Sequence, residues 1–157
     1  QKLKAMKLRK KTVTKIDRYY GNERAFSIRI REENGKATLN FKEKKREKGV
    51  ETNREIVLPV TSAGECHRLL KKLGIPLTGK KQKMNETYEN KDFHIELNHI
   101  PGLGDYLEIE TVVRRQKEIP KAKERLHGLF KQFGFSSADF EKKYYLELLQ
   151  EKDKRVK

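Results

Sequence analysis

Residues 27–31 read Ser27-Ile28-Arg29-Ile30-Arg31, so two isoleucines alternate with two arginines. Successive side chains of a β-strand point to opposite faces, which would place both isoleucines on one face and both arginines on the other. Residues 39–42, Leu-Asn-Phe-Lys, repeat the arrangement with Lys42 on the polar face. The sequence therefore predicts strands of a sheet that has one apolar face and one cationic face.

A third segment has the same alternation with the opposite charge. Residues 107–110, Leu-Glu-Ile-Glu, place Glu108 and Glu110 on one face of a strand. Hard divalent cations prefer oxygen ligands, and two carboxylates on one strand face can share such a cation with phosphate oxygens. If the cationic and acidic rows meet, the surface suits a polyanion bound together with a divalent metal.

The composition is that of a strongly basic chain with a modest apolar content. Among 157 residues, 34% are hydrophobic and 39% are charged, and 38 Lys+Arg against 23 Asp+Glu give a formal net charge of +15. This length predicts one domain, spanning residues 1–157, with a modest core. The positive field attracts polyanions such as nucleic acids, nucleotides and polyphosphate.

Several classes of protein are excluded by the sequence. Cys66 is the single cysteine, which excludes an intrachain disulfide and a cysteine-rich zinc site and is typical of a reducing compartment. No apolar run approaches the ~20 residues that cross a bilayer, and residues 1–11 lack the hydrophobic stretch of a signal peptide. We expect a cytoplasmic protein with no membrane partner.

Periodicity along the chain predicts about seven strands and three helices. Asn34-Gly35 marks a tight hairpin, and Ser62 is the expected N-cap of a helix. The charge-dense residues 44–49 are expected to form a loop, residues 1–10 the end of an amphipathic helix, and residues 150–157 a frayed charged tail. The expected strands are residues 12–20, 25–31, 37–43, 51–60, 80–89, 91–100 and 105–113, and the expected helices are residues 63–73, 119–133 and 137–149.

Antiparallel strands with helices between and after them define an α+β fold. The residues alone allow either an open sheet with one wet face or a barrel with its charged face inward. Unpaired like charges are too costly to bury, so a charged interior implies a solvated tunnel that a charged ligand occupies.

Five segments in register resemble the CYTH family of triphosphate tunnel enzymes, most closely its class IV adenylyl cyclase-like branch. The most specific segment is residues 101–110, Pro-Gly-Leu-Gly-Asp-Tyr-Leu-Glu-Ile-Glu. The other four are residues 17–20, 28–35, 39–42 and 143–149. The resemblance implies an eight-stranded antiparallel tunnel that binds a triphosphate through inward Arg and Lys, with Mg²⁺ or Mn²⁺ held by acidic residues.

Three positions depart from that family pattern. No Glu-x-Glu-x-Lys strand occurs before Thr12, and we expect this first strand to lie upstream of residue 1. Asn85 stands where the family usually has an inward Arg, and Asn98 stands where an Asp is usual. The two amides remove one cation and one anion from the tunnel lining that the resemblance implies.

The charged rows supply the candidate site residues. Guanidinium groups offer paired donors to phosphoryl oxygens, and ammonium groups offer point charges. No catalytic base is assigned. The predicted triphosphate-binding residues are Arg29, Arg31, Lys42, Arg54 and Lys83, and the predicted metal ligands are Glu108 and Glu110, with Glu55 as a further candidate.

The leading hypothesis is an adenylyl cyclase-like enzyme that converts ATP to cyclic AMP and pyrophosphate with Mg²⁺ or Mn²⁺. An inorganic or thiamine triphosphatase is the first alternative. A noncatalytic protein that binds nucleotides, polyphosphate or RNA 5′-triphosphate ends is the second. General RNA binding is a third, weakened by the scarcity of aromatic residues among the Lys and Arg. The expected partner is a small triphosphate such as ATP, and a homodimer is left open.

Overall fold

The computed structural model describes residues 8–21, 26–47 and 50–155, which form a single antiparallel sheet with three α-helices and two short 3₁₀ turns. Hydrogen-bonded neighbours follow the order β4-β3-β2-β1-β5-β6-β7. The strands are β1 (Arg9–Tyr20), β2 (Phe26–Glu33), β3 (Lys36–Glu47), β4 (Val50–Val60), β5 (Leu77–Glu89), β6 (His94–Ile100) and β7 (Gly104–Glu110). The helices are α2 (Ala63–Lys72), α3 (Ile119–Phe133) and α4 (Tyr145–Arg155), and the 3₁₀ turns are η1 (Gln116–Glu118) and η2 (Ser137–Asp139).

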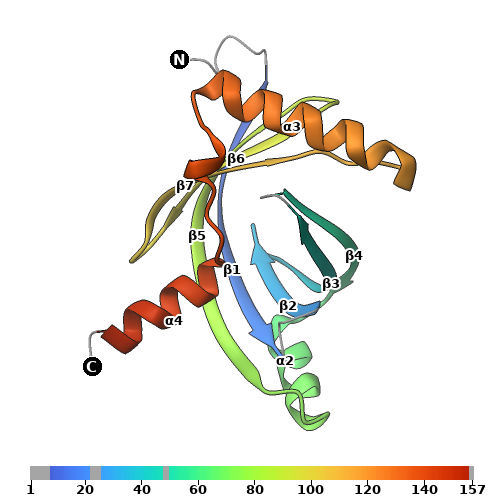
Figure 1. The fold of residues 1–157 in the computed structure, drawn as a ribbon. Coiled ribbons are helices and arrows are strands. Elements are labelled where there is room, and N and C mark those ends of the chain that lie inside the picture. The colour runs from blue at the N-terminus through green and yellow to red at the C-terminus, as the bar shows by residue number, and fades with distance from the viewer. Residues whose placement is uncertain (1–7, 22–25, 48–49, 156–157) are drawn as a thin grey trace.

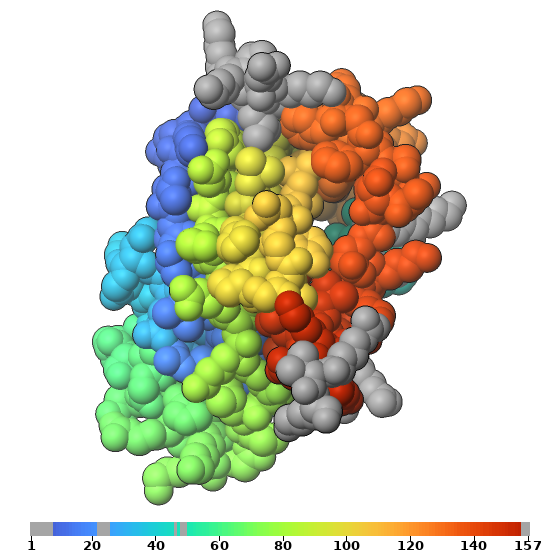
Figure 2. Space-filling model, turned by 90° about the vertical axis from the view of Figure 1, so that its left-hand side faces the viewer, coloured from blue at the N-terminus to red at the C-terminus, as the bar shows by residue number. Residues whose placement is uncertain are grey.

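The sheet curls around its central strands into a half-barrel with an inner and an outer face (Figure 1). Helix α3 crosses one end, and Lys123 Nζ lies 2.8 Å from Glu47 Oε2 at the end of β3. Helix α4 lies beside β5 and the turn between β6 and β7 (Figure 2), where Lys152 Nζ donates to the Gly102 carbonyl oxygen at 2.5 Å. The helices therefore join parts of the sheet that are distant in sequence.

The apolar core lies on the outer face of the sheet. Under α2, Tyr20 and Ile30 pack with Cys66 and Leu70. A second cluster joins β6 and β7 to α3 through Ile95, Ile109, Leu126 and Leu129. Because successive residues of a strand point to opposite faces, the polar residues that alternate with these core residues face the interior of the half-barrel.

Two short motifs predicted from the sequence, a hairpin turn and a helix N-cap, determine where the chain reverses and where α2 begins. Asn34 and Gly35 have φ of 50° and 72°, the left-handed conformation that a two-residue hairpin between β2 and β3 requires. Ser62 is the N-cap of α2, and its Oγ accepts from the Glu65 backbone N–H at 3.2 Å. Both predictions are confirmed.

Helix α4 approaches β5 unusually closely at Gly79. A Cβ atom at this glycine would stand 2.4 Å from Leu146 Cδ1, closer than side-chain carbons pack. Tyr145 meets Tyr106 of β7 in an edge-to-face contact with ring centroids 4.8 Å apart. The absence of a side chain at Gly79 therefore lets α4 dock against the half-barrel.

The predicted α+β class, with a curled antiparallel sheet and flanking helices, is confirmed, and the described residues supply seven strands. A loop was expected over residues 44–49, but residues 44–47 continue β3 because they pair with residues 50–53 of β4, and residues 48–49 lie outside the described residues. The helix expected over residues 137–149 begins later than predicted, since residues 137–139 form η2, residues 140–144 are not helical and α4 begins at Tyr145. Of residues 150–157, which were expected to fray, residues 150–155 continue α4 and residues 156–157 lie outside the described residues.

The start of the chain differs from the expectation where it is described. Arg9 and Lys10 belong to β1 rather than to a helix, while residues 1–7, also expected to be helical, lie outside the described residues. The strand expected upstream of residue 1 likewise lies outside them. No helix in the described ranges is both long enough and apolar enough to cross a membrane.

Candidate functional site

The interior of the half-barrel collects charged side chains from all seven strands of the sheet. The first group surrounds Asp17 of β1, whose side chain is fully buried. Arg31 Nε and Nη2 donate to its two carboxylate oxygens at 2.7 and 2.9 Å. Arg29 Nη1 lies 3.8 Å and Lys81 Nζ 3.5 Å from Asp17 Oδ2. One carboxylate thus holds three cations.

The surrounding cations favour the ionised form of Asp17. Burial alone would raise the pKa of its carboxyl, but the hydrogen bonds from Arg31 and the charges of Arg29, Arg31 and Lys81 hold that pKa well below its usual range. Burial acts in the opposite sense on Lys81, where it lowers the pKa of the ammonium group. The fixed negative charge therefore orients a cationic wall formed by β1, β2 and β5.

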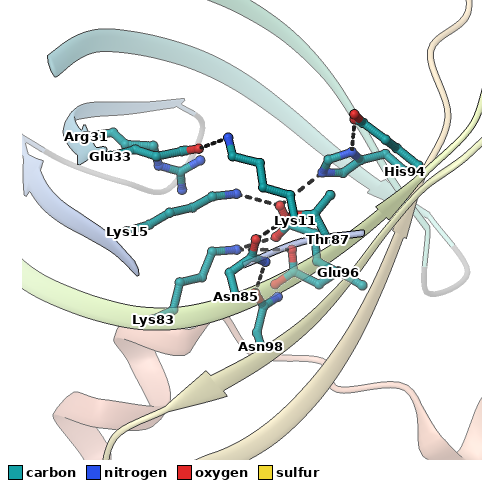
Figure 3. A network of polar contacts seen from close by, with 12 residues as sticks. Lys11, Lys15, Arg31, Glu33, Lys83, Asn85, Thr87, His94, Glu96 and Asn98 are labelled. Atoms are coloured by element: carbon teal, nitrogen blue, oxygen red, sulfur yellow. Dashed lines mark hydrogen bonds and ion pairs between the residues drawn. The ribbon is translucent and has the colours of Figure 1, made fainter. Parts of the chain in front are cut away.

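A second group surrounds Glu96 of β6 (Figure 3). Lys15 Nζ lies 2.6 Å from Glu96 Oε1, and Lys83 Nζ lies 2.6 Å from Oε2. His94 Nε2 stands 3.1 Å from Oε1. Burial opposes ionisation of Glu96, yet the hydrogen bond from His94 and the two lysines hold its pKa far below the usual range.

The predicted metal ligands face this second group across β6 and β7. Glu108 is the direct cross-strand partner of Glu96, and Lys83 Nζ also lies 3.8 Å from Glu108 Oε2. Glu110 pairs with His94. Desolvation, followed by the negative charges of Glu108 and Glu96, raises the pKa of Glu110, although Lys42 partly offsets this effect. Glu110 is exposed at the surface, and the neighbouring carboxylates raise its pKa in the same direction as desolvation does.

Glu108 and Glu110 fit part of a site for a hard divalent cation. A bound cation would offset the repulsion between these neighbouring carboxylates, and carboxylate oxygens are the ligands that such a cation prefers. In the chain as described, no group of three His, Cys, Asp or Glu side chains is arranged to hold a metal. Mg²⁺ is commonly held by one or two carboxylates together with substrate phosphates, so two protein ligands are compatible with a shared site.

A third group of charges, from β3 and β4, contains Lys42 and Glu55. Glu55 Oε1 accepts from Arg29 Nη2 at 3.3 Å and from Asn40 Nδ2 at 3.0 Å, while Lys42 Nζ lies 3.8 Å from Glu55 Oε2. Arg54 is exposed and pairs across the strands with Glu43, on the face opposite to Glu55. The structure therefore brings Glu55 to the cationic wall but does not bring Arg54 there.

Seven of the eight predicted site residues share the interior, and several further charged residues were missed. The predicted seven are Arg29, Arg31, Lys42, Glu55, Lys83, Glu108 and Glu110. The missed charges are Lys15, Lys81 and Glu96, all less than 10% exposed. Lys15 alternates with Asp17, and Lys81 with Lys83, so the same two-residue period carried a usable signal for the lysines.

Comparison with known proteins identifies the family to which the chain belongs. A sequence profile of the CYTH domain matches residues 2–145. The chain is 29% identical over 133 residues to “Putative adenylate cyclase MJ0240” of Methanocaldococcus jannaschii, covering 85% of this chain and 75% of that protein. It is 27% identical over 104 residues to Adenylate cyclase CyaB of Aeromonas hydrophila, covering 66% of this chain and 54% of that protein.

A solved structure gives the same result for the fold. The PH1819 protein of Pyrococcus horikoshii OT3 superposes with a TM-score of 0.78 at 31% sequence identity, covering 93% of this chain and 88% of that one. A curled antiparallel sheet with an interior of paired cations and carboxylates defines a protein of the tunnel-fold class. The chain belongs to the CYTH domain family, as the resemblance of its motifs predicted.

Proposed function

We propose that this protein is a metal-dependent enzyme acting on triphosphates, with ATP as substrate and cyclic AMP and pyrophosphate as products. One observation carries the proposal: a wall of three cations around the buried Asp17 shares an interior with Glu108 and Glu110. The match to proteins named as adenylate cyclases favours cyclisation over hydrolysis.

The cationic wall suits a chain of phosphates because its donors are already oriented. Arg31 is fixed by two hydrogen bonds to Asp17, and Arg29 by contacts to Asp17 and Glu55. Nε of Arg29 is buried and has no hydrogen-bond partner among the described residues. Donors held in place before the ligand arrives lose little entropy on binding, which favours charge stabilisation during reaction.

Glu108 and Glu110 are the residues that would hold Mg²⁺ or Mn²⁺, with Glu55 as a further candidate on the opposite wall. A bound divalent cation would neutralise phosphate charge as the leaving pyrophosphate forms. Lys83 stands between Glu96 and Glu108, so its ammonium group can contact the same phosphates.

Cyclisation requires one bond to form and one to break. The 3′-oxygen of the ribose bonds to the α-phosphorus, the bond from that phosphorus to the oxygen bridging to the β-phosphorus breaks, and the hydroxyl proton passes to water. In this step the protein positions the triphosphate through Arg29 and Arg31 and stabilises the negative charge of the departing pyrophosphate.

Product analysis tests the proposal. The protein is incubated with ATP, thiamine triphosphate or tripolyphosphate, each with Mg²⁺ or Mn²⁺, and the products are separated by chromatography. Cyclic AMP from ATP is the expected result. Inorganic phosphate without cyclic AMP would instead establish the triphosphatase alternative. Triphosphate binding without turnover would reject the enzyme and favour the noncatalytic alternative suggested by Asn85 and Asn98.

A paired substitution tests the metal ligands. Glu108→Gln with Glu110→Gln should abolish the dependence of tripolyphosphate binding on Mn²⁺, measured by calorimetry with and without the metal. Asp105→Asn is the matched control, because Asp105 lies on the same strand but is exposed on the other face, beside His99. Metal dependence that survives the double substitution would reject the assignment of both ligands.

A further inference from the structure

A neutral cluster interrupts the charged interior. Thr87 Oγ1 donates to Asn85 Oδ1 at 2.6 Å, and Asn85 Nδ2 donates to Asn98 Oδ1 at 2.6 Å (Figure 3). Asn85 is 0% and Asn98 1% exposed. Across β1 the next inward residue is Val13, the cross-strand partner of Asn85, which is apolar and buried. Four inward positions thus carry no charge.

The cluster ends on an unused hydrogen-bonding group. Asn98 Nδ2 is buried and has no partner among the residues that the structure describes. Reversing the direction of the chain of bonds would leave the Asn98 oxygen unpaired instead, so one amide atom lacks a partner in either orientation. Buried amides are nearly always hydrogen-bonded in folded proteins, and an orphan within a polar interior indicates a missing partner.

The neighbours of Asn98 indicate what that partner is. Asn98 pairs across the strands with Tyr106, whose ring contacts Tyr145 of α4. Burial and then the charge of Glu108 raise the pKa of the Tyr145 hydroxyl, whereas Asn98 acts to lower it, so this hydroxyl lies near both side chains. Two half-buried aromatic rings beside a neutral hydrogen-bonding group are typical of sites that bind a nucleoside, through stacking and polar contacts.

The cluster is also unsuited to phosphate. Asn85 and Asn98 supply no positive charge, whereas Arg29, Arg31 and Lys81 gather around Asp17. A ligand charged along its whole length would leave part of its charge against neutral groups. A ligand with one charged end and one neutral end could use both regions.

We propose that Asn98, held by Asn85 and Thr87, is a specificity-determining residue that hydrogen-bonds the uncharged nucleoside part of a nucleoside triphosphate. This inference rests on the proposed function, since the phosphates must occupy the cationic wall. The protein therefore selects nucleoside triphosphates over inorganic tripolyphosphate.

The test compares two ligands on matched variants. Dissociation constants for ATP and tripolyphosphate are measured by calorimetry with Mg²⁺ for the wild-type protein, Asn98→Ala and Gln82→Ala. Gln82 lies on the exposed outer face of β5, so its substitution removes an amide outside the site. Asn98→Ala should weaken ATP binding about tenfold and tripolyphosphate binding less than about twofold, as expected for the loss of one buried hydrogen bond. Gln82→Ala should change neither constant.

Each other outcome separates the inference from the proposed function. An equal loss of affinity for both ligands, or no loss for either, would reject the role of Asn98 while leaving a triphosphate site intact. Binding of neither ligand by the wild-type protein would reject the proposed function and the inference with it. If Asn98→Ala fails to fold, the wild-type protein decides alone: it should bind ATP at least about tenfold more tightly than tripolyphosphate, and equal affinities would overturn the inference.

Discussion

The carboxylate of Asp17 accepts two hydrogen bonds from the guanidinium of Arg31, at 2.7 and 2.9 Å, across neighbouring strands β1 and β2. This bidentate pair is buried on the Asp17 side, and Arg29 and Lys81 crowd the same carboxylate. Buried cations without a counterion are strongly unfavourable. Asp17 therefore makes it possible to keep an unliganded interior cationic.

Asp17→Asn should destabilise the fold. The amide keeps the size of the side chain but removes the charge that three buried or half-buried cations share, so we expect a loss of about 3 kcal/mol in the free energy of unfolding, measured with urea. Asp92→Asn is the control, because Asp92 pairs with Arg125 at 3.2 Å on the exposed surface. Its cost should stay below about 1 kcal/mol. Equal costs for the two variants would contradict the buried cluster.

The contribution of Asp17 should depend on pH in one direction. Its pKa is lower in the folded protein than in the unfolded chain, so the stabilisation is complete above the unfolded pKa of about 3.9 and is lost as pH falls toward the folded pKa. The difference in unfolding free energy between the wild-type protein and Asp17→Asn should therefore be constant from about pH 8 to pH 5 and shrink below about pH 4. A difference that declines near neutral pH would mean that Asp17 is not held ionised.

Site residues whose orientation follows from the two-residue alternation of a strand could be predicted from the sequence. Arg29 and Arg31 face inward because the two isoleucines that alternate with them, Ile28 and Ile30, pack in the outer core. The same period shows why Arg54 and Glu55 cannot both face the interior, since adjacent strand residues point to opposite faces. Glu55 is the residue that faces the interior, because it pairs across the strands with the inward residue Lys42.

Residues whose roles depend on strand order could not be predicted from the sequence. Lys15 and Glu96 are 81 positions apart and meet only because β1 and β6 both flank β5. The late start of α4 has a tertiary cause as well. Phe140 packs against Phe130 and His127, with ring centroids 5.1 and 5.6 Å away, and this contact accompanies extended chain after η2.

Gly79→Ala should loosen α4. The new methyl group would meet Leu146 Cδ1 at 2.4 Å and Cγ at 3.1 Å, and overpacking of this kind costs about 1–3 kcal/mol of stability. Limited proteolysis should release the C-terminal segment faster than in the wild-type protein. Gly128→Ala is the control, because this α3 glycine has nothing within 4 Å and should gain up to about 1 kcal/mol of helix propensity.

A second substitution identifies the cause of that loosening. Leu146→Ala added to Gly79→Ala removes the atoms that the new methyl group would strike. The double variant should then lose less stability than the sum of the two single variants, as residues in direct contact do. Strict additivity in urea unfolding would show that Gly79 acts through its backbone rather than through the space it leaves for Leu146.

Lys42 and Arg54 lie on paired strands, and their faces should decide their effects on triphosphate binding. Lys42 faces Glu55 inside the half-barrel, whereas Arg54 faces outward beside Glu43. Removal of a charged hydrogen bond to phosphate should weaken binding about tenfold, so we expect that change for Lys42→Gln and less than about twofold for Arg54→Gln. Calorimetry with tripolyphosphate and Mg²⁺ measures both constants at two salt concentrations, because general charge attraction is screened by salt and a direct contact much less so. Equal effects that vanish together at high salt would show that the phosphates respond to net charge and not to the inner wall.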